Sequence, residues 1–184
     1  MTKLRQFTIA CVALFSLLVV GCASVPLSTM VKMSQFGPEQ FVELDGNALR
    51  AKVTVEEAVG LKPEQTRLAV TIASPQGEFT KEFDFKLVSE TPVIEKRLFR
   101  DPLYWRDYEL KLSQQGYQTF QEFQQLVKAD PQLDSLSLSV GARLKNPPPE
   151  GEVVTLSIAL KLYEQEDYMP LFDKAEVKMG RTEL

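Results

Sequence analysis

Two segments, LSLSVGARL at residues 136–144 and VTLSIALKL at residues 154–162, carry the strongest structural pattern in the chain. In both segments every even-numbered residue is apolar, whereas the odd-numbered residues are small or polar. Successive side chains of a β-strand point to opposite faces, so this period of two predicts strands with one buried face. Proline cannot donate to a strand ladder, so the NPPPEG segment at residues 146–151 is expected to be a loop. We therefore expect an antiparallel hairpin in which Leu144 faces Val154.

The same alternation recurs on both sides of this pair. It is found at residues 49–55, 68–72, 79–87, 108–112 and 175–179, the last as an edge strand. Pro75, Gln76 and Gly77 are turn residues, and they predict a hairpin between the second and third of these runs. Seven strand-like runs, mostly in hairpins, indicate a mainly β, antiparallel domain. We expect a β-sandwich-like domain with one amphipathic helix, and the alternative is an α+β single antiparallel sheet covered by helices.

One helix is predicted among the strands, over about residues 119–129. Thr119 and Glu122 have the spacing of a capping box, which marks a helix start. Phe120, Phe123 and Val127 fall on one helical face, and Pro131 follows directly after the segment. An amphipathic helix of this kind packs its apolar face against a sheet.

The most aromatic stretch of the chain lies at residues 98–108, LFRDPLYWRDY, and contains its single tryptophan. Trp, Tyr and Arg are enriched at the energetic centres of protein interfaces. The stretch is therefore a candidate partner surface, formed by Phe99, Tyr104, Trp105 and Tyr108. The alternative interpretation is that Phe99, Trp105 and Tyr108 close one end of the core, because buried aromatic residues dominate protein interiors.

Composition excludes several kinds of chemistry. The chain has no histidine, and its two cysteines are Cys11 and Cys22. Histidine-based acid–base catalysis, Ser-His triads and most zinc sites are thereby excluded. No phosphate-binding glycine loop, nucleotide fingerprint or metal-ligand spacing is present, so we expect no cofactor and no metal. We interpret the acidic residues 164–167 as a solvated turn. The net charge of −4 is a poor match for nucleic acid or for anionic lipid headgroups.

The chain begins with MTKLRQFTIACVALFSLLVVGC at residues 1–22. Lys3 and Arg5 precede an almost entirely apolar run at residues 7–20, which is the pattern of a secretory signal peptide. The run is shorter than the roughly 20 apolar residues of a membrane-spanning helix.

The end of this run, Val19-Val20-Gly21-Cys22, resembles the lipobox of bacterial lipoproteins. The resemblance implies cleavage between Gly21 and Cys22, a diacylglyceryl group on the sulfur of Cys22 and an acyl group on its new amino terminus. Several acyl chains together anchor a protein stably. Residues 1–21 would then be removed, residues 22–37 would form a lipidated tether, and residues 38–184 would form a single β-rich domain. Ala23 occupies the position where the family's inner-membrane retention signal usually has Asp, so outer-membrane sorting is expected and the inner membrane is the alternative.

These observations lead to three functional hypotheses. The first is a non-catalytic outer-membrane lipoprotein that faces the periplasm and binds a protein partner in an envelope assembly. The second is a carrier or sensor of a lipid or another apolar small molecule, held in a cavity lined by Phe79, Phe83, Phe120 and Phe123. The third is a hydrolase that works through two carboxylates converging in one cleft.

Overall fold

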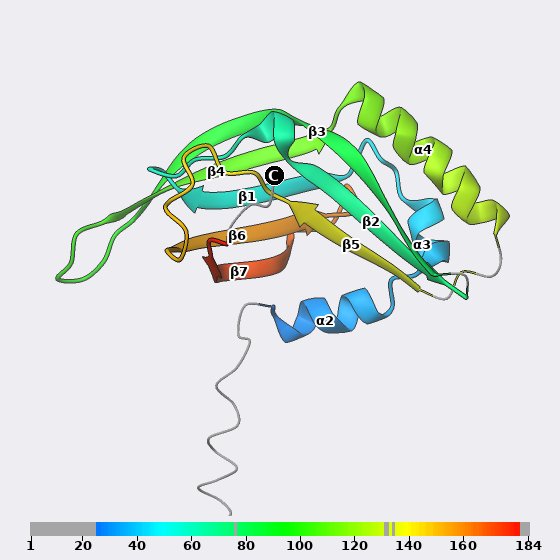
Figure 1. Cartoon of the computed structure of the whole chain (residues 1–184), viewed down its shortest axis with the longest axis horizontal. Coiled ribbons are helices and arrows are strands. Elements are labelled where there is room, and N and C mark those ends of the chain that lie inside the picture. The colour runs from blue at the N-terminus through cyan, green and yellow to red at the C-terminus, as the bar shows by residue number, and fades with distance from the viewer. Residues whose placement is uncertain (1–24, 76, 131–132, 134, 181–184) are drawn as a thin grey trace, which may run out of the picture.

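The computed structural model describes residues 25–75, 77–130, 133 and 135–180, so the predicted signal peptide and lipobox lie outside the described residues. The domain is mainly β, as the sequence predicts, and its seven strands form one antiparallel sheet (Figure 1). The order across the sheet is β5-β2-β3-β4-β1-β6-β7. The strands are β1 (Arg50–Glu56), β2 (Arg67–Ser74), β3 (Gly77–Glu95), β4 (Leu103–Leu112), β5 (Ser135–Gly141), β6 (Val153–Lys161) and β7 (Met169–Lys178).

The long strand β3 joins the two halves of this sheet. Its first part pairs with β2, from Ser74 opposite Gly77 to Arg67 opposite Asp84, which confirms the hairpin predicted there. Its second part, from Phe85 onward, pairs with β4. The register shifts between Leu87 and Ser89, and such bulges bend a strand and increase its twist. The sheet therefore curls, and the β2–β5 half leans over the half formed by β4, β1, β6 and β7 (Figure 1).

The core lies inside this curl, where the alternating apolar residues of both halves meet. In β1, β2 and β5 every second residue is buried, in keeping with the period of two in their sequences. The buried core residues of these strands are Ala51, Val53, Val55, Leu68, Val70, Ile72, Leu136, Leu138 and Val140. β6 contributes Val154, Leu156, Ile158 and Leu160 in the same way. The arrangement is sandwich-like, although one continuous sheet supplies both layers.

In the described part of the chain three α-helices accompany the sheet: α2 (Leu27–Ser34), α3 (Pro38–Glu43) and α4 (Gln114–Ala129). Pro38 begins α3 at the first helical position, where its missing N–H leaves no hydrogen bond unmade. α4 packs against β3 and α3, and it buries Phe120, Phe123 and Val127 as the sequence predicts. Its Gln124 side chain donates hydrogen bonds to the carbonyl oxygens of Phe41 at 2.8 Å and Leu44 at 2.9 Å. The backbone groups left free at the end of α3 are thereby satisfied.

The predicted start of the helix is wrong by five residues, because Gln114 and not Thr119 begins the hydrogen-bonded turns. Ser113 is the N-cap, and its Oγ accepts a hydrogen bond from the backbone N–H of Gly116 at 2.9 Å. The backbone N–H of Ser113 also donates to the carbonyl oxygen of Asp84 on β3 at 2.8 Å. This tertiary contact fixes the helix start at Ser113, and Thr119 lies inside the helix, where its capping pattern has no role.

The predicted hairpin of residues 136–144 with residues 154–162 is also wrong. β5 pairs with β2, placing Leu138 opposite Val70, whereas β6 pairs with β1 and β7. Leu144 instead makes an isolated bridge with Leu61. The segment between the two strands crosses from one half of the curled sheet to the other. Alternation fixes which face of a strand is buried, but it does not fix the neighbouring strand.

Candidate functional site

The predicted aromatic surface lies on the hairpin formed by the end of β3 and the start of β4, which projects from the body of the sheet (Figure 1). At its tip Leu98 is 83% exposed and Phe99 is 97% exposed. Phe99 has a φ of 60°, in the left-handed region that bulky residues rarely adopt. Ile94 and Tyr104 face each other across the hairpin, and both are more than half exposed. The tip is therefore an exposed apolar surface of four large side chains.

The structure does not bring the four predicted residues to one surface. Phe99 and Tyr104 are exposed, but Trp105 and Tyr108 are buried, with 7% and 4% of their surfaces accessible. Tyr108 belongs to the core, as the core interpretation predicts, whereas Phe99 does not. Trp105 and Tyr108 also lie on opposite faces of β4, because they are three positions apart along the strand. The four residues are close in sequence, but alternation along the strand directs their side chains to different faces.

The hairpin tip carries positive charge in a chain that is acidic overall. Lys96, Arg97 and Arg100 all lie within its closing loop. The Arg97 Nε donates to the carbonyl oxygen of Asp101 at 2.9 Å, which braces the loop. Lys96 and Arg100 are exposed, and neither has a recorded ion pair within the described part of the chain. At the end of β3, where the closing loop begins, Lys174 of β7 donates to Glu95 at 2.9 Å, and this hydrogen bond holds the pKa of Glu95 below its usual value.

A second apolar surface lies on α2. Leu27, Met30 and Val31 are all about half exposed or more, and their spacing places them on one face of the helix. The other face is fixed to the domain, because the buried Thr29 donates its hydroxyl proton to the carbonyl oxygen of Pro170 at 2.7 Å. Lys32 also donates to Glu166 at 2.7 Å, in the turn that the sequence predicts at residues 164–167. The apolar stripe of α2 is therefore held facing away from the sheet.

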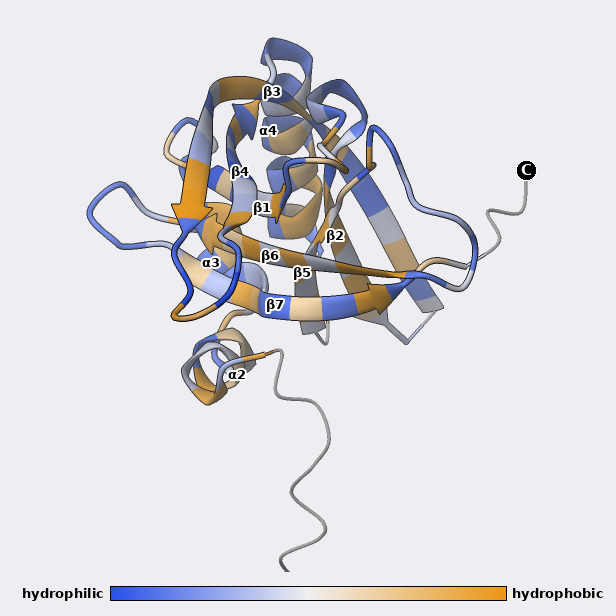
Figure 2. Cartoon of the chain, turned by 90° about the vertical axis from the view of Figure 1, so that its left-hand side faces the viewer, coloured by the Kyte–Doolittle hydropathy of each residue, from blue (hydrophilic) through white to orange (hydrophobic). Residues whose placement is uncertain are grey.

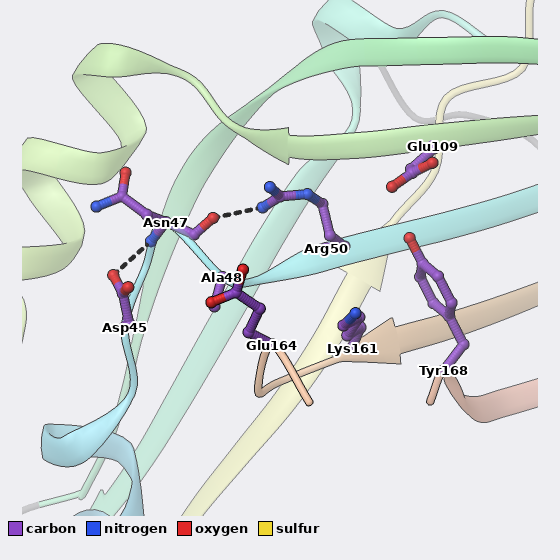
Figure 3. Close-up of a pocket in the computed structure, with 8 residues that line it drawn as sticks. All are labelled: Asp45, Asn47, Ala48, Arg50, Glu109, Lys161, Glu164 and Tyr168. Atoms are coloured by element: carbon purple, nitrogen blue, oxygen red, sulfur yellow. Dashed lines mark hydrogen bonds between the residues drawn. The ribbon is translucent and has the colours of Figure 1, made fainter. Parts of the chain in front are cut away.

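A polar pocket of about 290 Å³ opens beside the start of β1 (Figure 3). It collects charged side chains of both signs from three separate segments of the chain. Its lining residues are Asp45, Asn47, Ala48, Arg50, Glu109, Lys161, Glu164 and Tyr168. Sequence reasoning did not find this pocket, because its residues share no local motif and meet only when β1, β4 and β6 pair.

Tyr168 forms one wall of this pocket. Its hydroxyl oxygen is buried without a hydrogen-bond partner of ordinary geometry within the described chain, and it points toward the carboxylate of Glu109 (Figure 3). Burial raises the pKa of Tyr168 far above its usual value, and the adjacent Glu109 raises it further. Lys52 lies 4.5 Å from the centre of the ring, in a cation–π contact. Tyr168 is thus kept as a neutral phenol.

The pocket also bears on the hydrolase hypothesis, since Glu109 and Glu164 line the same cleft. In Figure 3 Glu164 lies on the side of Asp45, Glu109 lies on the side of Tyr168, and Lys161 stands between them. Paired acids of glycoside hydrolases instead flank one bond of the substrate directly. The described residues contain no cluster of acidic or thiol side chains suited to a metal ion. The pocket thus presents charged groups of both signs to a bound group.

The space that a lipid carrier would need between α4 and the sheet is filled by aromatic rings. Phe120 packs edge-on against Phe41 and Phe83, with ring centres 5.0 and 5.3 Å apart. Phe123 packs against Phe83 at 5.8 Å and against Phe79 at 6.1 Å. Such pairs fill a core efficiently and stabilise it beyond their buried area. An open cleft of about 220 Å³ lies at the outer end, between Phe79, Phe123 and Leu126.

The two edges of the sheet differ in how they are protected. β7 carries Pro170, Asp173, Lys174, Glu176 and Lys178, and its pairing with β6 is interrupted by register shifts. Charges, proline and bulges are the devices by which proteins prevent an edge strand from pairing with another chain. β5, SLSLSVG, has none of them, and its exposed residues are Ser135, Ser137, Ser139 and Gly141. Within the described residues β5 pairs only with β2, so its other edge is open.

Comparison with known proteins identifies no relative: no family model, curated protein or solved structure matches this chain. Among the described residues, none of the helices has the length and apolar character needed to cross a bilayer.

Proposed function

We propose that this protein is a non-catalytic lipoprotein of the outer membrane, facing the periplasm, that binds a protein partner in an envelope assembly. The lipobox-like Val19-Val20-Gly21-Cys22 supports the anchor, with the lipid on Cys22. The filled aromatic core weighs against a carrier, and the mixed charges of the polar pocket weigh against hydrolysis by paired acids.

The open edge of β5 is the observation that carries the partner-binding proposal. An edge strand presents a row of unpaired backbone N–H and C=O groups, and an extended segment of another protein can add to it as a further strand. β5 offers seven residues without charge or proline, while the opposite edge is blocked. Its inward residues are already buried in the core, so a partner would gain backbone hydrogen bonds without disturbing the fold. The partner is thus proposed to be a protein with an exposed extended segment.

Crosslinking in cells tests this site. A photoreactive residue at Ser137 on β5 should give a discrete protein adduct, and the same residue at Glu176 on the blocked edge should not. Introducing Ser135→Lys and Ser139→Lys on the same exposed face should abolish the adduct, because lysines on an edge discourage strand addition. Absence of an adduct at Ser137, or its persistence in the lysine variant, would show that the partner does not use this edge.

A separate experiment tests the anchor. Labelled fatty acid should enter the wild-type protein but not the Cys22→Ser variant, and the variant should leave the membrane fraction. Incorporation of label into Cys22→Ser would show that the lipobox interpretation is wrong, whatever the outcome at β5.

A further inference from the structure

The outward face of α2 and the tip of the β3–β4 hairpin are two exposed apolar surfaces that the partner site at β5 does not use. In the two views taken 90° apart, the hairpin tip bends toward the side of the domain on which α2 lies (Figures 1 and 2). The exposed apolar side chains of these two segments are Leu27, Met30 and Val31 of α2 and Leu98 and Phe99 of the tip. A single flat surface could contact both.

The sequence distance from the proposed anchor limits where α2 can lie. Cys22 precedes Leu27 by five residues. A fully extended chain of that length spans at most about 18 Å. If the sulfur of Cys22 carries lipid, the first turn of α2 cannot be farther than that from the membrane surface. The contacts of Thr29 and Lys32 fix the opposite face of α2 to the domain, so the face left available to the membrane is the apolar one.

The charge of the hairpin tip identifies the kind of surface that it fits. Basic residues beside an apolar wedge are attracted to anionic lipid headgroups while the wedge enters the headgroup–acyl boundary. Lys96 and Arg100 flank Leu98 and Phe99, and neither has a recorded ion pair within the described residues. Tyr104, half exposed behind the tip, has the amphipathic side chain that is enriched at membrane interfaces. The chain as a whole is acidic, so this local positive charge is a specific feature of the tip.

We propose that α2 and the hairpin tip together form a membrane-contacting surface, in which Phe99 and Leu98 insert into an anionic lipid surface. This inference rests on the proposed lipidation of Cys22, which brings α2 to the bilayer. The insertion of the tip is a second attachment, and it fixes the orientation of the domain. Phe99 lies midway along the closing loop between Glu95 and Leu103 and is 97% exposed, so its ring is available for insertion.

Fluorescence quenching by brominated lipids tests this arrangement. The mature lipidated protein carrying Phe99→Trp is reconstituted into vesicles of phosphatidylcholine and phosphatidylglycerol with brominated acyl chains. Phe79→Trp is the control, because Phe79 is an exposed phenylalanine near the start of β3, at the end of the strand remote from the hairpin tip. The wild-type protein supplies the background of the buried Trp105. The tryptophan at position 99 should lose intensity and shift to the blue, and the one at position 79 should not.

Charge reversal supplies the second arm of the test. Lys96→Glu together with Arg100→Glu should reduce the quenching at position 99 in vesicles that contain phosphatidylglycerol, and added salt should do the same in the unreversed protein. Quenching at position 99 no greater than at position 79 would overturn the proposal. So would a protein adduct from a photoreactive residue at position 99 in cells, since the tip would then belong to a protein interface.

Separate measurements test the lipid anchor at Cys22 and the membrane contact of the hairpin tip. The mass of the purified protein reports whether Cys22 carries lipid, and an unlipidated mass refutes the anchor. A lipidated protein without quenching at position 99 refutes only the membrane contact of the tip.

Discussion

Replacing Gly116 by alanine is expected to unseat α4 from the sheet. Gly116 lies in the first turn of the helix and is buried against β3. A methyl group placed on its Cα would lie 2.2 Å from the carbonyl oxygen of Asp84 and 3.0 Å from the backbone nitrogen of the same residue. Both are backbone atoms of a paired strand, so no flexible side chain can move aside. The helix start must shift away from β3.

Three contributions determine the expected change in the free energy of unfolding, and one of them is stabilising while two are destabilising. In a helix alanine is more favourable than glycine by about 1 kcal/mol, which would stabilise the variant if space were available. Overpacking a rigid contact costs up to about 3 kcal/mol. A shift of the helix start also weakens the hydrogen bond from the Ser113 N–H to the Asp84 carbonyl, which contributes about 1 kcal/mol. We expect a net loss of about 2–3 kcal/mol in the free energy of unfolding.

Thermal unfolding followed by far-ultraviolet circular dichroism measures this loss. For a chain of this length the midpoint should fall by about 5–10 °C. Two controls separate the steric clash from other effects of substitution by alanine. Gly141→Ala adds a methyl group that meets nothing within 4 Å, and Gln118→Ala introduces alanine at an exposed position of α4. Both should stay within about 0.5 kcal/mol of the wild type. A Gly116→Ala protein as stable as the wild type would refute the close approach of α4 to β3.

Two further predictions concern other buried polar groups. Gln124→Leu should lower the unfolding free energy by about 1–3 kcal/mol, because the buried carbonyl oxygen of Leu44 loses the Gln124 donor, while that of Phe41 still accepts from the Leu44 N–H. Gln121→Leu on the exposed face should cost less than about 0.5 kcal/mol, and urea unfolding of both variants compares them. Glu109→Gln should lower the pKa of Tyr168 partway toward its ordinary value of 10.0, which an absorbance titration of tyrosinate detects. Because folding raises this pKa, burial of the neutral phenol contributes fully to the stability of the fold below about pH 10, and the contribution is lost as the pH rises further. If Tyr168 titrated at the same pH as the exposed tyrosines, its burial would be contradicted.

The strands were predictable because burial of one face imposes a period of two on the sequence, whatever the neighbouring strand is. The predicted pairing of residues 68–72 with the run at residues 79–87 is correct up to residue 84, since a short turn leaves such strands little choice of partner, but residues 85–87 pair with β4. The runs at residues 136–144 and 154–162 lack this constraint. The chain between β5 and β6 is long enough for each strand to pair elsewhere, and the pairing was decided by β2 and β1.

The candidate surfaces divide in the same way. The aromatic stretch drew attention in the sequence, but only the fold shows that Trp105 and Tyr108 are buried while Leu98 and Phe99 are exposed. The open edge of β5 could not be predicted, because an edge strand and a central strand with one buried face have the same alternation. The polar pocket around Tyr168 forms only when three distant segments meet, and no local sequence pattern predicts it.

The sequence by itself determined the mainly β character, the faces of the strands, the apolar face of α4 and the pattern that predicts a lipid anchor at Cys22. Each of these features depends on the spacing of residues within a single segment, so it can be predicted without knowing how the segments pack together. Only the tertiary structure decided the order of the strands, the start of α4 at Ser113, the free edge at β5 and the position of the hairpin tip relative to α2. Each of these results from competition between distant segments for backbone hydrogen bonds and buried surface, and that competition is settled only when the whole chain folds.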